Sequence, residues 1–296
     1  LYLLFGGDTI KVDTGVFELT NSVTIGVLMS GDSTNRTGII GSTNLAAGGS
    51  VFLPGPGMQD PGFVIQSGHD FNLSYFRLSG FTNGVSVNLA NDCTLAHLDI
   101  QGSTGVGIPV VLANRIRMEH VLIREGQTNA VQLGASQGIN LDGCVLWSNR
   151  SHAISFGSAQ AFVTNSVIEA GNDATFCYYS STGGTIRADF NNLYIHNGAQ
   201  IAFVEGLQYE KLPQWVRSTS QDQHSLSTDP LFHDPDNGDF HLRSVAGRYQ
   251  NGTGWTNDAA ATNRHQIVFD AGATTVRTIG GSLVNQFVAV GGNGPL

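Results

Sequence analysis

The sequence predicts a β-solenoid, a coil in which short strands stack rung upon rung. An apolar segment recurs about every 23 residues, and such a fixed period indicates units that bury their apolar faces by stacking on their neighbours. Glycine is abundant, with 38 residues, while charged residues make up only 12% of the chain. The recurring segments read FVI at 63–65, VSV at 85–87, IPV at 108–110, VQL at 131–133, ISF at 154–156, FCY at 176–178 and IAF at 201–203.

A second apolar column supplies another inward-facing strand in each unit. Its members are Leu78, Ile100, Ile123, Leu146, Ile168 and Ile195. The middle residue of each recurring segment should face outward because side chains alternate along a strand, and this places Cys177 and Ala202 outside. Cys144 falls in an inward column. No cysteine has a partner at a matching offset, so we expect free thiols.

The chain divides into three consecutive parts. Residues 1–61 contain short alternating strands and a loop region rich in Gly, Ser, Asn and Pro, and 62–205 hold the regular rungs with polar corners. Residues 206–296 keep no rung of normal length and are expected to form an irregular capping segment and tail, since an uncovered end would expose strand edges. Helical periodicity over a dozen residues is absent, which predicts an all-β fold.

The charge balance limits the classes of partner. The net charge is -9, and Lys11 and Lys211 are the only lysines. Nucleic acid and anionic membrane surfaces both require clustered basic residues, so neither is expected as a partner. No apolar run approaches the length of a membrane span. Because the chain starts at Leu1 without methionine, we expect a segment of a longer exported precursor.

The region after the rungs carries a family resemblance. The segments NNLYIHNG at 191–198, YEKLPQW at 209–215, SQDQHSLSTDPLF at 220–232 and DPDNGDFHL at 234–242 resemble the closing part of secreted right-handed parallel β-helix proteins of the pectate-lyase-like group. With the rungs, the resemblance covers about residues 8–243. It implies a right-handed single-stranded coil, export from a bacterial cell to its surface or surroundings, and association with polysaccharides. It implies no single activity, because a fold hosts many.

One corner column contains residues suited to a sugar. Arg124, Trp147, Glu169 and His196 follow the second apolar column on successive rungs, which lie about 4.8 Å apart. Tryptophan offers an apolar platform, arginine binds carboxylates, and Glu169 or His196 could transfer protons. The four residues are therefore candidates for substrate binding, and Arg124, Glu169 and His196 for catalysis. A row of solvated corner residues is the alternative.

Two other pairs of residues stack on neighbouring rungs. Glu119 and Asp142 occupy equivalent corners and could hold Ca²⁺, although two ligands fall short of the six or more that this ion takes; a solvated turn is the alternative. His97 and His120 stack in the next column, where bonding to the backbone is favoured over metal binding.

An apolar strip is expected on the outer face of the second strands. It comprises Leu122, Val145, Val167 and Tyr194. An exposed strip of this kind marks an interface or a surface covered by another segment. We expect the tail, 244–296, to cover it through VNQFVAV at 284–290, with contact to a neighbouring chain as the alternative.

Two functional hypotheses remain open. The first is an exported β-helix module at the cell surface with a structural or glycan-binding role, which could self-assemble through its uncapped N-terminal strands. The second is a polysaccharide lyase or glycoside hydrolase acting on an extracellular glycan. The Asn-Thr-Asp, Gly-His-Gly and Asp-Pro-His motifs of related enzymes are absent from the sequence, so no motif decides whether the chain is an enzyme.

Overall fold

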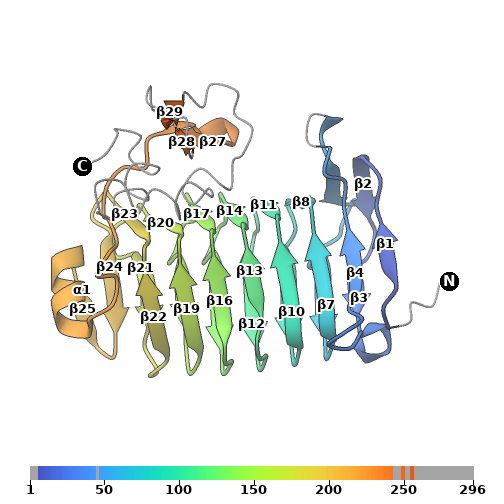
Figure 1. The fold of residues 1–296 in the computed structure, drawn as a ribbon, viewed down its shortest axis with the longest axis horizontal. Helices are drawn as coiled ribbons and strands as arrows, with labels where there is room; N and C mark the ends of the chain where they lie inside the picture. Colours follow the sequence, from blue (N-terminus) through green and yellow to red (C-terminus); the bar gives the residue numbers. More distant parts are fainter. Residues whose placement is uncertain (1–5, 45–46, 243–247, 251–253, 257–296) are drawn as a thin grey trace.

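Three parallel sheets wrap around one elongated core in a computed structural model of the chain (Figure 1). The structure describes residues 6–44, 47–242, 248–250 and 254–256. Each rung contributes one strand to each sheet, and strands of successive rungs pair in parallel. The chain is therefore a single-stranded parallel β-helix, as the repeat predicts.

The first sheet runs the length of the coil. Its strands are β1 (Thr9–Lys11), β4 (Thr37–Ile40), β7 (His69–Ser74), β10 (Asn91–Ala96), β13 (Arg117–Glu119), β16 (Ile139–Asp142), β19 (Gln160–Thr164) and β22 (Thr185–Asp189). The second sheet contains β2 (Gly15–Leu19), β5 (Ser50–Pro54), β8 (Phe76–Ser79), β11 (Asp99–Gln101), β14 (Leu122–Arg124), β17 (Val145–Trp147), β20 (Val167–Ala170) and β23 (Asn192–Ile195).

The third sheet carries the recurring apolar segments. Its strands are β3 (Val23–Ile25), β6 (Phe63–Gln66), β9 (Val85–Asn88), β12 (Ile108–Val111), β15 (Val131–Gly134), β18 (Ile154–Phe156), β21 (Phe176–Ser180), β24 (Gln200–Val204) and the antiparallel β25 (Leu207–Tyr209). Strands β1, β2 and β3 pair with β4, β5 and β6, so the coil already includes the N-terminal region.

Short elements complete the described chain. These are the 3₁₀ helices η1 (Val27–Met29) and η3 (Pro235–Asn237), the helix α1 (Leu212–Thr219), the hairpin β26 (Phe232–Asp234) with β27 (Asp239–Leu242), and the hairpin β28 (Arg248–Gln250) with β29 (Gly254–Thr256). Within the part of the chain that the structure describes, no helix has the length and apolar character needed to span a bilayer.

Left-handed corner residues turn the chain from the first sheet to the second. Tyr75, His97 and His120 all have φ between 52° and 64°, and their rings stack, with centroids 4.6 Å apart for the first pair and 5.1 Å for the second. The predicted stacking of the two histidines is confirmed. Gly143 ends the stack, because a Cβ there would lie 2.6 Å from His120 Nδ1.

All three thiols are free and buried. Cys144 points inward as predicted, but the outward placement of Cys177 and Ala202 is wrong, because both are fully buried. Ile154 pairs with Tyr178. The recurring segments in the sequence had placed it opposite Phe176, two residues earlier. Since Phe176, Cys177 and Tyr178 are all apolar, the sequence pattern could not distinguish the faces of this strand.

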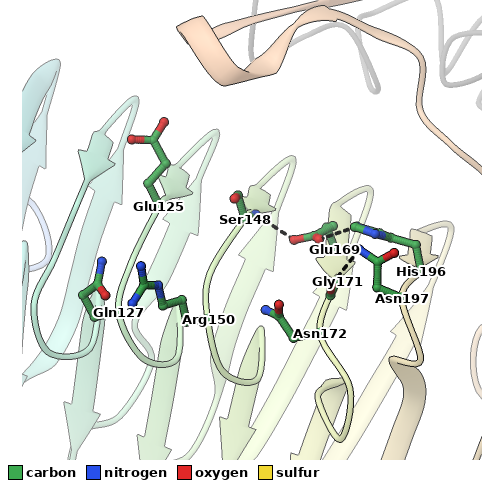
Figure 2. A pocket seen from close by; sticks show the side chains of 9 residues that line it. All are labelled: Glu125, Gln127, Ser148, Arg150, Glu169, Gly171, Asn172, His196 and Asn197. Carbon is green, nitrogen blue, oxygen red and sulfur yellow. Dashed lines mark hydrogen bonds and ion pairs between the residues drawn. The ribbon is translucent and has the colours of Figure 1, made fainter.

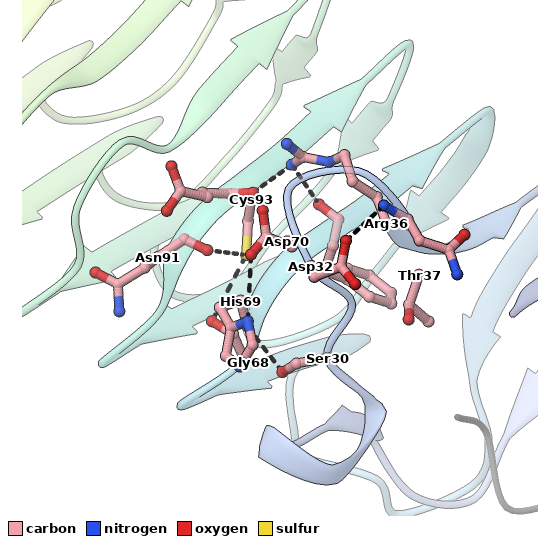
Figure 3. Close-up of polar contacts among 12 residues, drawn as sticks. Ser30, Asp32, Arg36, Thr37, Gly68, His69, Asp70, Asn91 and Cys93 are labelled. Carbon is pink, nitrogen blue, oxygen red and sulfur yellow. Dashed lines mark hydrogen bonds and ion pairs between the residues drawn. The ribbon is translucent and has the colours of Figure 1, made fainter. Parts of the chain in front are cut away.

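Arg36 fastens the long connection between β3 and β4 to the coil (Figure 3). Its guanidinium donates to Asn72 Oδ1 at 3.0 Å and to the backbone carbonyls of Phe71 and Asp92. Cys93 lies beneath this connection, and burial raises the pKa of its thiol to about 11. The thiol is therefore an inert part of the core.

Candidate functional site

The end of the second sheet differs in register from the predicted columns. Ile168 pairs with Leu193, and Glu169 pairs with Tyr194. The inward position that the sequence assigned to Ile195 therefore belongs to Leu193, and Tyr194, rather than His196, continues the column of Arg124, Trp147 and Glu169. A shift of two residues keeps apolar side chains on the same face, so strand alternation could not reveal it.

His196 nevertheless reaches Glu169. It lies at the corner after β23, and its Nε2 is 2.7 Å from Glu169 Oε1. The backbone N–H of Ser148 donates to Glu169 Oε2 at 2.6 Å. The Glu169 side chain is only 4% exposed, whereas that of His196 is 34% exposed. Burial raises the pKa of Glu169, although its hydrogen bonds from Ser148 and His196 act in the opposite direction.

Gly171 makes this contact possible. A Cβ on residue 171 would lie 2.1 Å from Glu169 Oε1 and 2.6 Å from His196 Nε2. Glu169 and Tyr194 pair across neighbouring strands. Gly171 follows Glu169 by two positions, and His196 follows Tyr194 by two positions, so Gly171 and His196 occupy equivalent places on the two rungs. The imidazole therefore occupies the space that a side chain on the preceding rung would fill.

A polar cavity of about 470 Å³ opens around this pair (Figure 2). Four further side chains on successive rungs line it, each three positions after a member of the column: Gln127, Arg150, Asn172 and Asn197. Arg150 and the two asparagines are exposed. The remaining lining residues are Glu125, Ser148, Glu169, Gly171 and His196. This series was not among the candidates predicted from the sequence, although its constant offset of three residues is visible there.

Arg124 lies outside this cavity, in a buried ionic network. Its guanidinium donates to Asp99 Oδ1 at 3.2 Å, to Glu125 Oε1 at 2.9 Å and to Gln101 Oε1 at 2.9 Å, and its side chain is 7% exposed. Gly238 covers it, since a Cβ on that glycine would lie 3.1 Å from Arg124 Nη2. Arg124 therefore contacts the cavity only through Glu125.

Trp147 is also covered by the chain. Its indole stacks on Tyr194 with centroids 5.8 Å apart, and it meets Phe232 and Phe240 edge-on. With Phe232 and Phe240 it belongs to a small apolar cluster, and it does not line the cavity. The four residues of the predicted column therefore separate into two pairs. Glu169 and His196 contact each other, whereas Arg124 and Trp147 contact a segment that covers them.

That covering segment is the strap, which we define as residues 226–242. Phe232 and Phe240 bury Leu122, Val145 and Val167, which are 0–2% exposed. The apolar strip is therefore covered by the strap, and its assignment to 244–296 is wrong for these residues. Tyr194 belongs to the neighbouring column. The segment VNQFVAV lies outside the described residues.

Glu119 and Asp142 pair in register, as predicted. Asp142 Oδ1 accepts hydrogen bonds from Thr164 Oγ1 at 3.1 Å and Asn165 Nδ2 at 2.9 Å. Among the described residues, no three His, Cys, Asp or Glu side chains lie close enough together to hold a metal ion. The carboxylate of Asp142 is thus engaged by the next rung, and Ca²⁺ binding at this corner stays a prediction.

A family match agrees with this architecture. The family described as the right-handed β-helix region matches residues 61–209, which is half of the chain. The chain belongs to the right-handed β-helix family. A search of curated proteins finds no significant match to this β-helix protein.

Solved structures with the same fold share little sequence with this β-helix protein. The pectate lyase Pel9A aligns with a TM-score of 0.50 at 12% identity, covering 79% of this chain and 76% of its own. An alginate lyase from Paenibacillus sp. str. FPU-7 has a TM-score of 0.42 at 13% identity, covering 67% of this chain and 92% of its own. The A-module of the Azotobacter vinelandii mannuronan C-5 epimerase AlgE6 also scores 0.42, at 10% identity, covering 69% and 75%. The similarity to the pectate lyase shows the fold alone.

Proposed function

We propose that this protein is an exported β-helix module at the cell surface that binds an extracellular polysaccharide in the cavity around Glu169 and His196. The observation that carries the proposal is the series of Gln127, Arg150, Asn172 and Asn197. Because successive rungs lie about 4.8 Å apart, the series presents amide and guanidinium groups at regular intervals along the coil. A linear polymer with repeating hydroxyl and carboxyl groups matches such an array.

The electrostatics of the cavity support a saccharide. Arg150 has no ion-pair partner among the described residues, so its guanidinium is free to bind a carboxylate or hydroxyl of a ligand. The asparagine amides can both donate and accept hydrogen bonds, as neighbouring sugar hydroxyls do. The pectate lyase Pel9A, which has the same fold, is named for its action on pectate, which makes uronic-acid polymers the first ligands to test.

Binding to a panel of immobilised polysaccharides tests this proposal. Arg150→Ala and Asn197→Ala should each weaken the binding by about tenfold, which corresponds to the loss of one charge-assisted or shared hydrogen bond. Arg117→Ala is the matched control, because Arg117 is also an exposed arginine but lies on the first sheet. If polysaccharide binding weakened equally in Arg117→Ala and in Arg150→Ala, the cavity would not be the binding site.

The Glu169–His196 contact supports a second candidate function, cleavage of the bound polysaccharide by a lyase or hydrolase reaction. A partly exposed imidazole held by a buried carboxyl can take up or release a proton at a bound sugar. His196 would contact the substrate, and Glu169 would act as a positioning residue.

Ultraviolet absorbance and reducing-end assays on uronic-acid polymers test for cleavage. If the second candidate is right, product forms with the wild-type protein and is lost in Glu169→Gln and His196→Ala, while both variants still bind the polymer. Absence of product with a polymer that binds would leave the chain as a binding module.

A further inference from the structure

Three aromatic side chains form a continuous stack beside the cavity. The Trp147 indole stacks on Tyr194 with ring centroids 5.8 Å apart, and Tyr194 stacks on His196 with centroids 4.8 Å apart. Trp147 and Tyr194 lie in the same column, one rung before and one rung after Glu169. Because two rungs span about 9.6 Å, the two rings lean toward each other across the rung of Glu169. The stack ends at the imidazole that bonds to Glu169 (Figure 2).

The strap holds the first ring of this stack. Phe232 and Phe240 meet the Trp147 indole edge-on, with centroids 5.2 and 6.2 Å from it. Both phenylalanines are buried, at 3% and 1% exposure. Ring pairs at these separations attract each other whether they are stacked or edge-on. Displacement of the strap would therefore leave Trp147 without two of its neighbours.

The strap also holds the strand that carries the second ring. Tyr194 lies on β23, where the backbone N–H of Leu193 donates to the Leu226 carbonyl at 2.8 Å. The Asn192 side chain donates to the Thr228 carbonyl at 2.9 Å and accepts from the Thr228 N–H at 3.1 Å. The strap is thus attached to the stack at both Trp147 and Tyr194.

Tyr194 lies between the strap and the cavity. Burial raises the pKa of its phenol, and the carboxylates of Asp229 on the strap and of Glu169 raise it further. The hydroxyl therefore stays neutral, and the ring packs as an uncharged aromatic group against its two stacked neighbours. This position suits Tyr194 to transmit a movement of the strap to His196.

We propose that the strap positions the His196 imidazole against Glu169 through Trp147 and Tyr194, which makes Tyr194 a positioning residue of the cavity. The His196 side chain is 34% exposed, and stacking on Tyr194 restricts its rotation away from Glu169. Packed side chains in contact can carry such coupling between separate sites. A docked strap therefore keeps the Glu169–His196 pair formed, and a displaced strap releases it. The functional importance of this control rests on the proposed polysaccharide site, but the contacts that produce it do not.

Nitrogen-15 nuclear magnetic resonance of the His196 ring tests the proposal without a ligand. The Nε2 resonance reports the hydrogen bond to Glu169, and Glu169→Ala supplies its position when that bond is absent. Tyr194→Leu should move the resonance toward this position, whereas Tyr194→Phe, which keeps the ring, should leave it at the wild-type value. Tyr179→Leu is the matched control, because Tyr179 of the third sheet also stacks on a histidine, His152, with centroids 4.0 Å apart.

Phe240→Ala tests the transmission from the strap and does not depend on the folding of Tyr194→Leu. The ring of Phe240 packs on Trp147 and Phe232, so its loss reaches His196 only through the stack. The substitution should move the His196 resonance in the same direction as Tyr194→Leu, and it should add nothing in a protein that already carries Tyr194→Leu.

Three results would overturn the proposal: a wild-type His196 resonance in Phe240→Ala, additive effects of the two substitutions, or a Tyr194→Phe protein altered as much as Tyr194→Leu. Failure of polysaccharide binding would leave these measurements unchanged and would count against the proposed function alone.

Discussion

Glu169 Oε1 and His196 Nε2 lie 2.7 Å apart although the residues are 27 positions apart in sequence. The contact joins two neighbouring rungs over Gly171, whose missing side chain leaves room for the imidazole. The pair is therefore fixed by three residues on two rungs, and its geometry is open to a direct test.

Gly171→Ala should separate the pair. The added methyl would stand 2.1 Å from the carboxyl oxygen and 2.6 Å from the imidazole nitrogen, so the imidazole has to move away. Glu169 then loses a hydrogen bond that lowers its pKa, and we expect this pKa to rise further. Nuclear magnetic resonance titration of the Glu169 side chain measures this change in pKa.

Gly134→Ala is the control for that experiment. A Cβ at residue 134 would meet only Val111 side-chain atoms, the nearest at 3.8 Å. Unchanged titration in Gly171→Ala, or an equal change in Gly134→Ala, would show that the glycine does not position the pair.

Phe240→Ala should loosen the strap. The ring is 1% exposed and packs on Trp147 and Phe232, and removing a buried phenylalanine costs about 3–5 kcal/mol. We expect early proteolytic cleavage within 226–242 while the rungs keep their circular dichroism signal. Phe162→Ala, a half-buried residue on the outer face of the first sheet, should leave the cleavage pattern of the wild type.

Asp222→Ala should destabilise the closed end of the coil. The Asp222 carboxyl accepts hydrogen bonds from Trp215 Nε1 at 3.0 Å, Ser225 Oγ at 2.6 Å and Asn191 Nδ2 at 3.0 Å. Its loss leaves the buried Trp215 Nε1 without its acceptor and removes one acceptor each from Ser225 and Asn191, at a cost of about 3 kcal/mol in the free energy of unfolding. Urea denaturation followed by tryptophan fluorescence measures the effect, and the exposed Asp60→Ala variant should match the wild type.

Stability should fall as the pH drops below about 6.5. Burial lowers the pKa of His97, and the neighbouring His120 lowers it further. The folded state thus keeps His97 neutral at a pH where the unfolded chain, with a pKa near 6.5, already takes up a proton. The contribution of neutral His97 to the stability of the folded state is complete above pH 6.5. It is lost as the pH falls from 6.5 toward the pKa of His97 in the folded state.

His97→Phe isolates this contribution. Phenylalanine keeps a ring between Tyr75 and His120 but carries no titratable group, so the loss of stability between pH 7 and 5.5 should become smaller. Thermal unfolding across that pH range measures it. An unchanged slope would assign the pH dependence to other groups, such as His152, whose pKa burial also lowers.

The rungs could be predicted from sequence because their apolar residues recur at a fixed period. The register of the last rungs could not be predicted. Leu193 and Ile195 are both apolar and lie on the same face, so either could pair with Ile168. The apolar strip was recognisable, but the segment that covers it depends on the path of the chain after the last rung, which has no period. Arg124 and Trp147 share a column with Glu169, and only the position of the strap shows that Arg124 is buried and Trp147 half-buried. Arg150 was detectable at its constant offset from that column.

The strap runs back along the coil, from Leu226, whose backbone bonds to Asn191 and Leu193, to Gly238 over Arg124. Neighbouring rungs are joined by hydrogen bonds that a pull along the coil axis would open one rung at a time. The strap lies across several rungs, so the same pull loads its contacts together in shear. The half of the coil beneath it should therefore yield last when the molecule is stretched between its ends.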